Sequence, residues 1–159
     1  MSHYNLQNSD KVLVEGIAHL LRDEVAGWAE NSEYGVPNVW PKSPPASVEE
    51  EYPRAVVDII AGDDTELSTE LDVRLREAIV RVVVFSDTSG DVFDLTDAVD
   101  DVVPKHFDSL NSEGNPYTGD WSYRELDGFA ETNEVGETEG KLRYSRYKDF
   151  IFETVRVKE

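Results

Sequence analysis

The chain has 159 residues, with 34 Asp and Glu against 15 Lys and Arg, which gives a formal net charge of −19 at pH 7. This charge argues against a general nucleic-acid binder, which needs a cationic surface, and against an anionic membrane as partner. The chain has no cysteine, which excludes disulfides, thiolate metal sites and cysteine nucleophiles. No apolar run approaches the roughly 20 residues of a membrane span, and the first ten residues do not form a signal peptide. We expect one domain over residues 1–159, with a flexible N-terminus at 1–8.

The acidic residues are spread among enough apolar residues (39%) to build a core, unlike those of an acidic disordered segment. Nine Arg stand against six Lys. An acidic surface poor in Lys suits concentrated salt, where the Debye length falls to about 3 Å and repulsion between the acids is screened. The composition therefore indicates a protein of a halophile's cytoplasm, or one assembled there. A nucleic-acid mimic and an ordinary acidic protein are the alternatives.

A helix is predicted from Asp10 to Ala29, because Leu13, Ile17, Leu21 and other apolar residues recur at helical spacing, with Asn8 or Ser9 as cap. Residues 31–52 follow as a long irregular loop with no periodicity. Its apolar and aromatic residues must pack, either on the domain itself or on a neighbour. These residues are Tyr34, Val39 and Trp40.

Two strands come next, Arg54 to Ala61 and Glu70 to Ser86, separated by a turn that begins at Gly62-Asp63-Asp64. The stretch from Ile79 to Phe85 is apolar on both faces except for Arg81, which predicts a central strand covered on both sides. The first half of the second strand alternates Leu with Asp and Arg, so we expect it to project from the sheet.

A second helix is predicted from Asp91 to Val103, with Asp91 as N-cap and Pro104 at its end. After a loop at 109–119, we expect antiparallel strands at 121–131, 141–146 and 150–157, with a turn-like link at 132–140. The fold class is therefore α/β (α+β), a mainly antiparallel sheet with two helices packed on it, in the order α-β-β-α-β-β, with one more short strand as an alternative.

No motif of a known catalytic chemistry is present in the sequence. Asp87, Ser89 and Asp91 match the first positions of a calcium loop, but Val92 and Ala98 stand where that loop needs Gly and Glu. The three histidines have no ligand spacing, and nucleotide-binding and hydrolase signatures are missing. We expect no enzyme, no cofactor and no metal site.

Arginines gather on two stretches, Arg74, Arg76 and Arg81 on the long strand and Arg143, Arg146 and Arg156 on the last strands. They pair either with acids on neighbouring strands of the same chain or with carboxylates of another subunit. Four of them, together with the loop aromatics, are candidate contacts to other subunits or to a tube. The full set of candidates is Tyr34, Val39, Trp40, Asp63, Asp64, Leu71, Arg74, Arg76, Arg143 and Arg146.

The segments PRAVVDIIAGDD (53–64) and LDVRLREAIVRVVVFS (71–86) resemble the tail terminator, or tail-completion, proteins of tailed viruses. The order of elements over about residues 10–157 resembles theirs as well. With the salt-adapted composition, this resemblance implies a virion protein of a tailed virus that infects a halophilic archaeon and is assembled in the host cytoplasm.

What the resemblance implies is a homomeric ring, commonly of six copies, that caps the tail tube and joins it to the neck. The implied partners are other copies, the tail tube protein and a neck or connector protein. DNA passes through an acidic lumen without specific binding, and no membrane is involved. The alternatives are a head–tail connector of the neck, an acidic cytoplasmic protein that mimics DNA, and a small halophilic enzyme.

Overall fold

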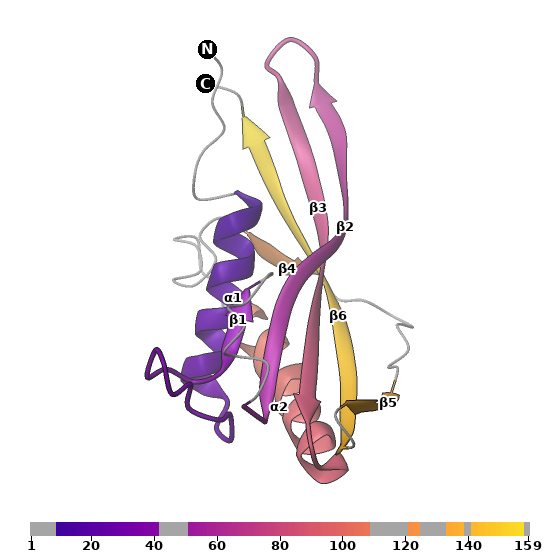
Figure 1. Ribbon diagram of the computed structural model, residues 1–159. Coiled ribbons are helices and arrows are strands. Elements are labelled where there is room, and N and C mark those ends of the chain that lie inside the picture. The colour runs from indigo at the N-terminus through magenta and orange to yellow at the C-terminus, as the bar shows by residue number, and fades with distance from the viewer. Residues whose placement is uncertain (1–8, 42–50, 109–120, 125–132, 139–140, 158–159) are drawn as a thin grey trace.

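The fold is α+β in the computed structural model, which describes residues 9–41, 51–108, 121–124, 133–138 and 141–157. Over these residues two helices lie on one side of a six-stranded sheet (Figure 1). The strand order is β1-β2-β3-β6-β4, with β5 also paired to β6. All pairs are antiparallel except β1 with β2, which confirms the predicted fold class. The elements are α1 (Asp10–Glu24), β1 (Val39–Pro41), β2 (Arg54–Ser68), β3 (Val73–Ser86), α2 (Ser89–Asp108), β4 (Ser122–Arg124), β5 (Asn133–Thr138) and β6 (Lys141–Val157).

Helix α1 begins where the sequence predicted and ends five residues earlier. The Ser9 side chain accepts a hydrogen bond from the Val12 amide at 3.2 Å, which caps the first turn. At the other end the Leu21 carbonyl accepts hydrogen bonds from the Val25 amide and from the Trp28 indole. Gly27 then adopts a φ of 109°, which a helix does not allow. The indole thus packs back on the helix instead of extending it.

The core lies between the helices and the facing side of the sheet. Eight of its apolar residues come from the two helices and from β2 and β3, and Ile59 is partly buried and packed against them. The eight are Ile17, Leu21, Val57, Val80, Val82, Val84, Leu95 and Val99.

Strand β2 is longer than the sequence predicted. Gly62, Asp63 and Asp64 are paired within it, opposite Ala78, Glu77 and Arg76 of β3. The strand continues to Ser68, and the turn to β3 lies at residues 69–72. There Asp72 has a φ of 49°, a conformation that a short polar side chain tolerates. The predicted turn at 62–64 was wrong because cross-strand pairing outweighs a weak local turn signal.

Helix α2 is longer than predicted at both ends. It begins at Ser89, and the Thr88 hydroxyl accepts from the Asp91 amide at 3.4 Å, so Thr88 takes the capping role that was expected of Asp91. Pro104 lies inside the helix, which continues to Asp108. A single proline removes one donor, and the packed face of the helix outweighs that loss.

The C-terminal third is arranged differently from the prediction. Strand β6 is continuous from Lys141 to Val157, where two strands were expected, because residues 147–149 pair with β3 without interruption. Strand β5 occupies most of the expected link at 132–140. The predicted strand at 121–131 is described only to Arg124, and the rest of it lies outside the described residues, as do the N-terminus at 1–8 and the loop at 109–119.

The two faces of the sheet differ, although the sequence predicted that both would be covered. Even-numbered residues of β3 from Ala78 to Ser86 are buried under the helices, and odd-numbered ones are partly exposed. Within the described residues no helix covers this second side, which we call the open face (Figure 1).

Candidate assembly surfaces

Strands β2, β3 and β6 extend past the helices as a three-stranded arm (Figure 1). We define the arm as residues 61–77 with residues 153–157. The side chains at 61–67 are all exposed. The sequence predicted that this part of the long strand projects from the sheet; instead it stays paired with β2 and β6, and the three strands project together past the helices. A short three-stranded sheet with no covering layer gains little stability by itself. Its conformation therefore depends on side-chain contacts to the rest of the subunit or to a partner.

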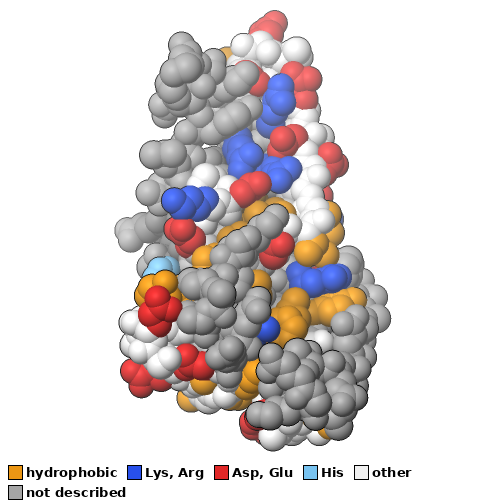
Figure 2. All heavy atoms as spheres, viewed as in Figure 1, with side chains coloured by type: hydrophobic (Ala, Val, Ile, Leu, Met, Phe, Trp, Pro, Cys, Tyr) orange, Lys and Arg blue, Asp and Glu red, His pale blue; other side chains and the backbone are white. Residues whose placement is uncertain are grey.

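Three arginines of the arm share the face that points toward α1. Arg74 and Arg156 are directly opposite each other on β3 and β6, which would repel without countercharges. Asp10, at the start of α1, accepts hydrogen bonds from Arg76 at 3.0 Å and from Arg156 at 2.7 Å. Arg76 also lies 3.8 Å from a carboxylate oxygen of Asp64, and Arg74 lies 3.3 Å from that of Asp72. Figure 2 shows this mixture of basic and acidic side chains on the arm.

These contacts favour pairing within the chain over pairing between subunits. The side chains of Arg76 and Arg156 are only 16% and 15% exposed, and the carboxylate of Asp10 in α1 binds both of them. Asp10 was not among the predicted functional residues, and nothing in the sequence signals its role because it lies 66 residues from Arg76. The Trp121 indole contacts the same end of α1, because it donates a hydrogen bond to the Ser9 carbonyl at 2.9 Å.

Gly62 makes this arrangement possible. A Cβ at position 62 would collide with the guanidinium of Arg76. Glycine leaves space for the arginine to lie against the backbone of the neighbouring strand.

We expect Gly62→Val to push Arg76 away from Asp10 and to lower the free energy of unfolding by about 1 kcal/mol, or roughly 3 °C in melting temperature. Thermal unfolding of the purified protein measures this. Ala61→Val is the matched control, because Ala61 is the exposed neighbour with its side chain on the open face. In an Arg76→Ala background the cost of Gly62→Val should largely disappear; an unchanged cost would mean that the contact is not responsible.

The open face of the arm carries an apolar band and, next to it, a row of acids. Val73 pairs with Val157 and Leu75 with Val155, which places four apolar side chains together at the end of the arm. Val155 and Val157 are 49% and 48% exposed. The next row contains three carboxylates, and Arg124 of β4 donates to one of them at 2.7 Å. These are Asp63, Glu77 and Glu153.

Nearer the centre of the open face, Arg81 donates two hydrogen bonds to Asp149, at 2.8 and 3.0 Å. The guanidinium also lies 3.7 Å from the centre of the Tyr147 ring. The hydrogen bond to Asp149 raises the pKa of Arg81 above its usual value. The Asp149 side chain is only 3% exposed, and Arg81 neutralises the charge of this nearly buried carboxylate. Strand β6 can therefore continue through Asp149 without a break.

The loop before β2 packs largely on its own domain. Asn31 and Asn38 are fully buried and joined by a hydrogen bond of 3.3 Å, and Asn38 also accepts from the Trp40 indole at 2.6 Å. The Arg22 guanidinium lies 4.9 Å from the centre of the Trp40 ring, and burial lowers the pKa of Arg22. Val39 is fully buried, so its side chain belongs to the core and offers no surface to a partner. Of the three predicted contacts in this loop, Tyr34, packed edge-on against Trp40, stays 49% exposed.

The other predicted contacts are scattered. Asp63 and Asp64 lie on opposite faces of the arm, and Leu71 is 69% exposed at its tip. Arg146 is buried, 3.4 Å from Asp97 and stacked over Phe93, far along β6 from the arm. Arg143 pairs with Gly136 of β5, and its side chain lies outside the described residues. The structure thus places five of the candidates on the arm, with Asp64 3.8 Å from Arg76, and leaves the others elsewhere. The five are Asp63, Asp64, Leu71, Arg74 and Arg76.

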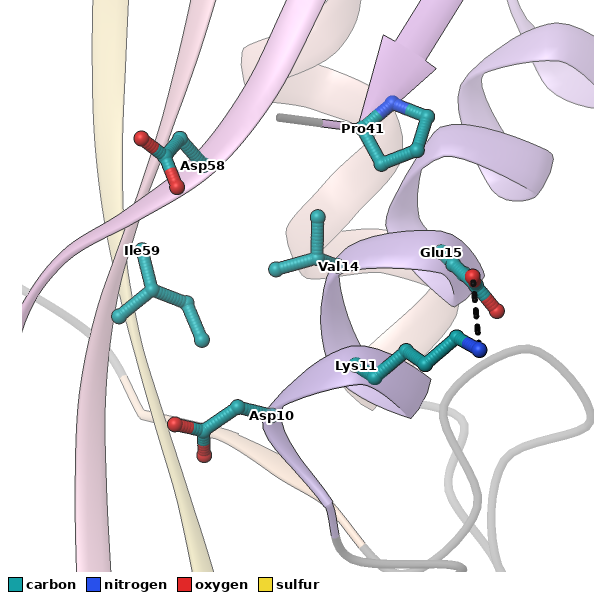
Figure 3. Close-up of a pocket in the computed structure, with 7 residues that line it drawn as sticks. All are labelled: Asp10, Lys11, Val14, Glu15, Pro41, Asp58 and Ile59. Atoms are coloured by element: carbon teal, nitrogen blue, oxygen red, sulfur yellow. Dashed lines mark ion pairs between the residues drawn. The ribbon is translucent and has the colours of Figure 1, made fainter. Parts of the chain in front are cut away.

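An open hollow of about 450 Å³ lies between α1 and β2 (Figure 3). Val14 and Ile59 point into it, while Lys11 and Glu15, 3.9 Å apart, lie at its outer margin. Asp10 is also at the margin and is already engaged by two arginines. The polar groups do not converge on one point, as those of a small-molecule site do. Among the described residues no cluster of His, Asp and Glu is placed to hold a metal ion, and no helix is long and apolar enough to cross a membrane.

Comparison with known proteins finds a distant likeness among solved structures. No protein-family model and no curated protein matches the chain. Among solved structures it is similar to a chain of the virion of a native gene transfer agent particle, with 15% identity and a TM-score of 0.40 over 90% of this chain and 92% of that one. This likeness is too distant to carry an argument about function.

Proposed function

We propose that this chain is a structural protein of a virion, and specifically a tail terminator whose copies form a ring between the tail tube and the neck. The observation that carries the proposal is the arm. It projects beyond the helices and exposes Leu67, Leu71, Val155 and Val157 at its end. A monomer gains nothing from apolar side chains held out in solvent on such a projection, whereas an interface between subunits would bury them.

Two further features support a structural role in a salt-adapted particle. The net charge of −19 gives the chain an excess of acids, and a ring lumen lined by acids would not retain DNA, because phosphate affinity comes from cations. The order of elements also resembles that of tail terminators. Copies in a closed ring make head-to-tail contacts, and a projection on each subunit suits that geometry.

The mass of the purified protein in molar KCl tests the proposal. We expect a closed oligomer whose mass is a fixed multiple of 17.9 kDa, and we expect the protein in purified virus particles. A monomer at high protein concentration that is also absent from particles would overturn the proposal. A ring found on the head side of the neck, away from the tube, would favour the head–tail connector instead.

Arg74→Glu is the sharper test of the arm in this role. Arg74 is 39% exposed, and among the described residues its ion pair is with Asp72 alone, so the subunit fold should change little. The substitution places a carboxylate beside Asp72 and near the end of the arm, and we expect it to weaken the oligomer about tenfold while the melting temperature shifts by a few degrees at most. Sedimentation velocity measures the first effect.

Lys105→Glu is the matched control, because it makes the same change of charge at an exposed position of α2, away from the arm. Equal weakening by both variants would show that only net charge matters. Trp40→Ala is not suitable for this test, since Trp40 is bound to Asn38 and packed on Arg22 within the subunit. It should therefore destabilise the subunit itself.

A further inference from the structure

We propose that the outer edge of β2, from Asp58 to Ser68, binds an extended, basic segment of another protein, which adds to the sheet as one more strand. The bound segment continues the line of β1 and places an apolar side chain in the hollow between α1 and β2. The proposal is independent of the tail-terminator role and holds whether or not copies of this chain form a ring.

The first observation is a long sheet edge without a partner. Strand β3 pairs with one side of β2 over its whole length, whereas β1 covers the other side only at Ala55 to Val57. Beyond that point, from Asp58 to Ser68, the described residues provide no strand on the outer side, and the side chains at 60–67 are all exposed. The backbone donors and acceptors of such an edge are satisfied by water or by another strand. The edge itself therefore specifies an extended backbone as its ligand.

The sequence that follows β1 is unsuited to fill this edge. Strand β1 ends at Pro41, and the next residues are Lys42-Ser43-Pro44-Pro45. Proline has no amide hydrogen and cannot donate a hydrogen bond to a neighbouring strand. The position after Pro41 along β2 is therefore better filled by a strand from elsewhere.

The hollow lies where β1 ends and the open edge begins. Pro41, Asp58 and Ile59 line it together with the first turns of α1 (Figure 3). Val14 and Ile59 point into its volume of about 450 Å³. A strand laid along β2 after Pro41 turns every second side chain toward this side of the sheet. An apolar side chain at that position contacts Val14 and Ile59, and its burial adds to the backbone hydrogen bonds.

The charge of the edge selects the partner. Residues 58–68 include four acids and no Lys or Arg, and among the described residues only one of the four has an ion pair, Asp64 with Arg76 at 3.8 Å. A second copy of this chain, with the same acidic edge and a net charge of −19, is repelled. A segment with Lys or Arg beside the acids supplies the cations that β2 lacks, which favours a basic segment of a different protein. The four acids are Asp58, Asp63, Asp64 and Glu66.

Two synthetic peptides of equal length test the preference for charge. One alternates valine with lysine, and the other alternates valine with glutamate. Fluorescence anisotropy of the labelled peptides measures their binding to the whole protein, at the lowest KCl concentration that keeps the protein folded, because salt screens the attraction. We expect the lysine peptide to bind about tenfold more tightly than the glutamate peptide.

A third peptide separates strand addition from attraction between charges. It is the lysine peptide with proline in place of the central valine, so it keeps every charge and loses a backbone donor. We expect it to bind about tenfold more weakly than the lysine peptide. Hydrogen exchange then locates the site: with the lysine peptide bound, the amides at 58–68 should exchange more slowly, while those of α2 should not change.

A pair of protein variants tests the edge directly. Glu66→Lys reverses the charge of an exposed side chain on the edge, and we expect it to weaken binding of the lysine peptide several-fold. Asp101→Lys is the matched control, because it makes the same change of charge at an exposed position of α2 and should have little effect. Both variants should keep the circular dichroism of the parent.

Each of four outcomes would overturn the proposal in a different way. Equal binding of the lysine peptide and its proline form would show attraction between charges without strand addition. Equal binding of the lysine and glutamate peptides would rule out the basic partner. Slow exchange at 58–68 in the assembled protein without any peptide would show that another copy occupies the edge. Binding of none of the peptides would mean that the acids only protect the edge from unwanted pairing, and it would leave the proposed ring untouched.

Discussion

Val82→Asp should lower the free energy of unfolding by several kcal/mol, the largest single-residue effect that we expect in this protein. Val82 is 1% exposed, in the middle of β3 and beneath the helices. A carboxylate there either remains charged without a partner or must take up a proton, and both are costly. Chemical denaturation followed by circular dichroism measures the loss, and we expect much of the protein to be unfolded or insoluble.

The adjacent residue supplies the control for this effect. Val83 lies on the same strand with its side chain on the open face, where it is partly exposed. Val83→Asp makes the same chemical change and should cost clearly less, because water reaches the carboxylate. Equal losses from the two substitutions would contradict the assignment of one covered and one open face.

Salt should have the second large effect, and its sign is positive: the melting temperature should rise steadily from dilute buffer to molar KCl. Lowering the salt from 1 M to 0.1 M lengthens the Debye distance from about 3 Å to about 10 Å, so that repulsion between carboxylates on separate elements grows. The effect should be largest where carboxylates form a row, as they do at Asp63, Glu77 and Glu153. In the described residues Arg124 is the one cation bound within this row.

Differential scanning calorimetry over a KCl series measures this dependence. Sucrose at matched viscosity controls for effects that do not arise from ions. A melting temperature that is flat or falls with added KCl would contradict the interpretation of the composition as salt-adapted. A rise that saturates near 0.1 M would point to ordinary screening of a few pairs instead.

The main elements could be predicted from the sequence because their signals are local. The stripe of Leu13, Ile17 and Leu21 repeats at the helical period, and the alternation through Val80, Val82 and Val84 repeats every second residue. Burial of one face is encoded directly in such patterns. The covered face of β3 and the helix on it follow from the same signals, and the structure confirms them.

Several predictions failed where a weak local signal competed with pairing to a distant segment. Gly62 to Asp64 have the composition of a turn but lie within β2, because β3 supplies partners for them. Residues 147–149 were expected to be a break but lie within β6, because Arg81 neutralises Asp149 from the neighbouring strand. The parallel pairing of β1 with β2 left no signal, since three residues are too few to show a period.

The charge of the surface, the absence of thiol chemistry and the class of fold all follow from the amino-acid sequence alone. The sequence also places apolar and arginine side chains on the strands of the arm. Which of them remain available to a partner depends on the three-dimensional arrangement. Arg76 and Arg156 meet Asp10 across 66 and 146 residues of chain, and Val155 comes to lie beside Leu75 on the open face. Periodicity reports which face of an element is buried, whereas the identity of a side chain's partner depends on strand register, which pairs residues that are remote in the chain.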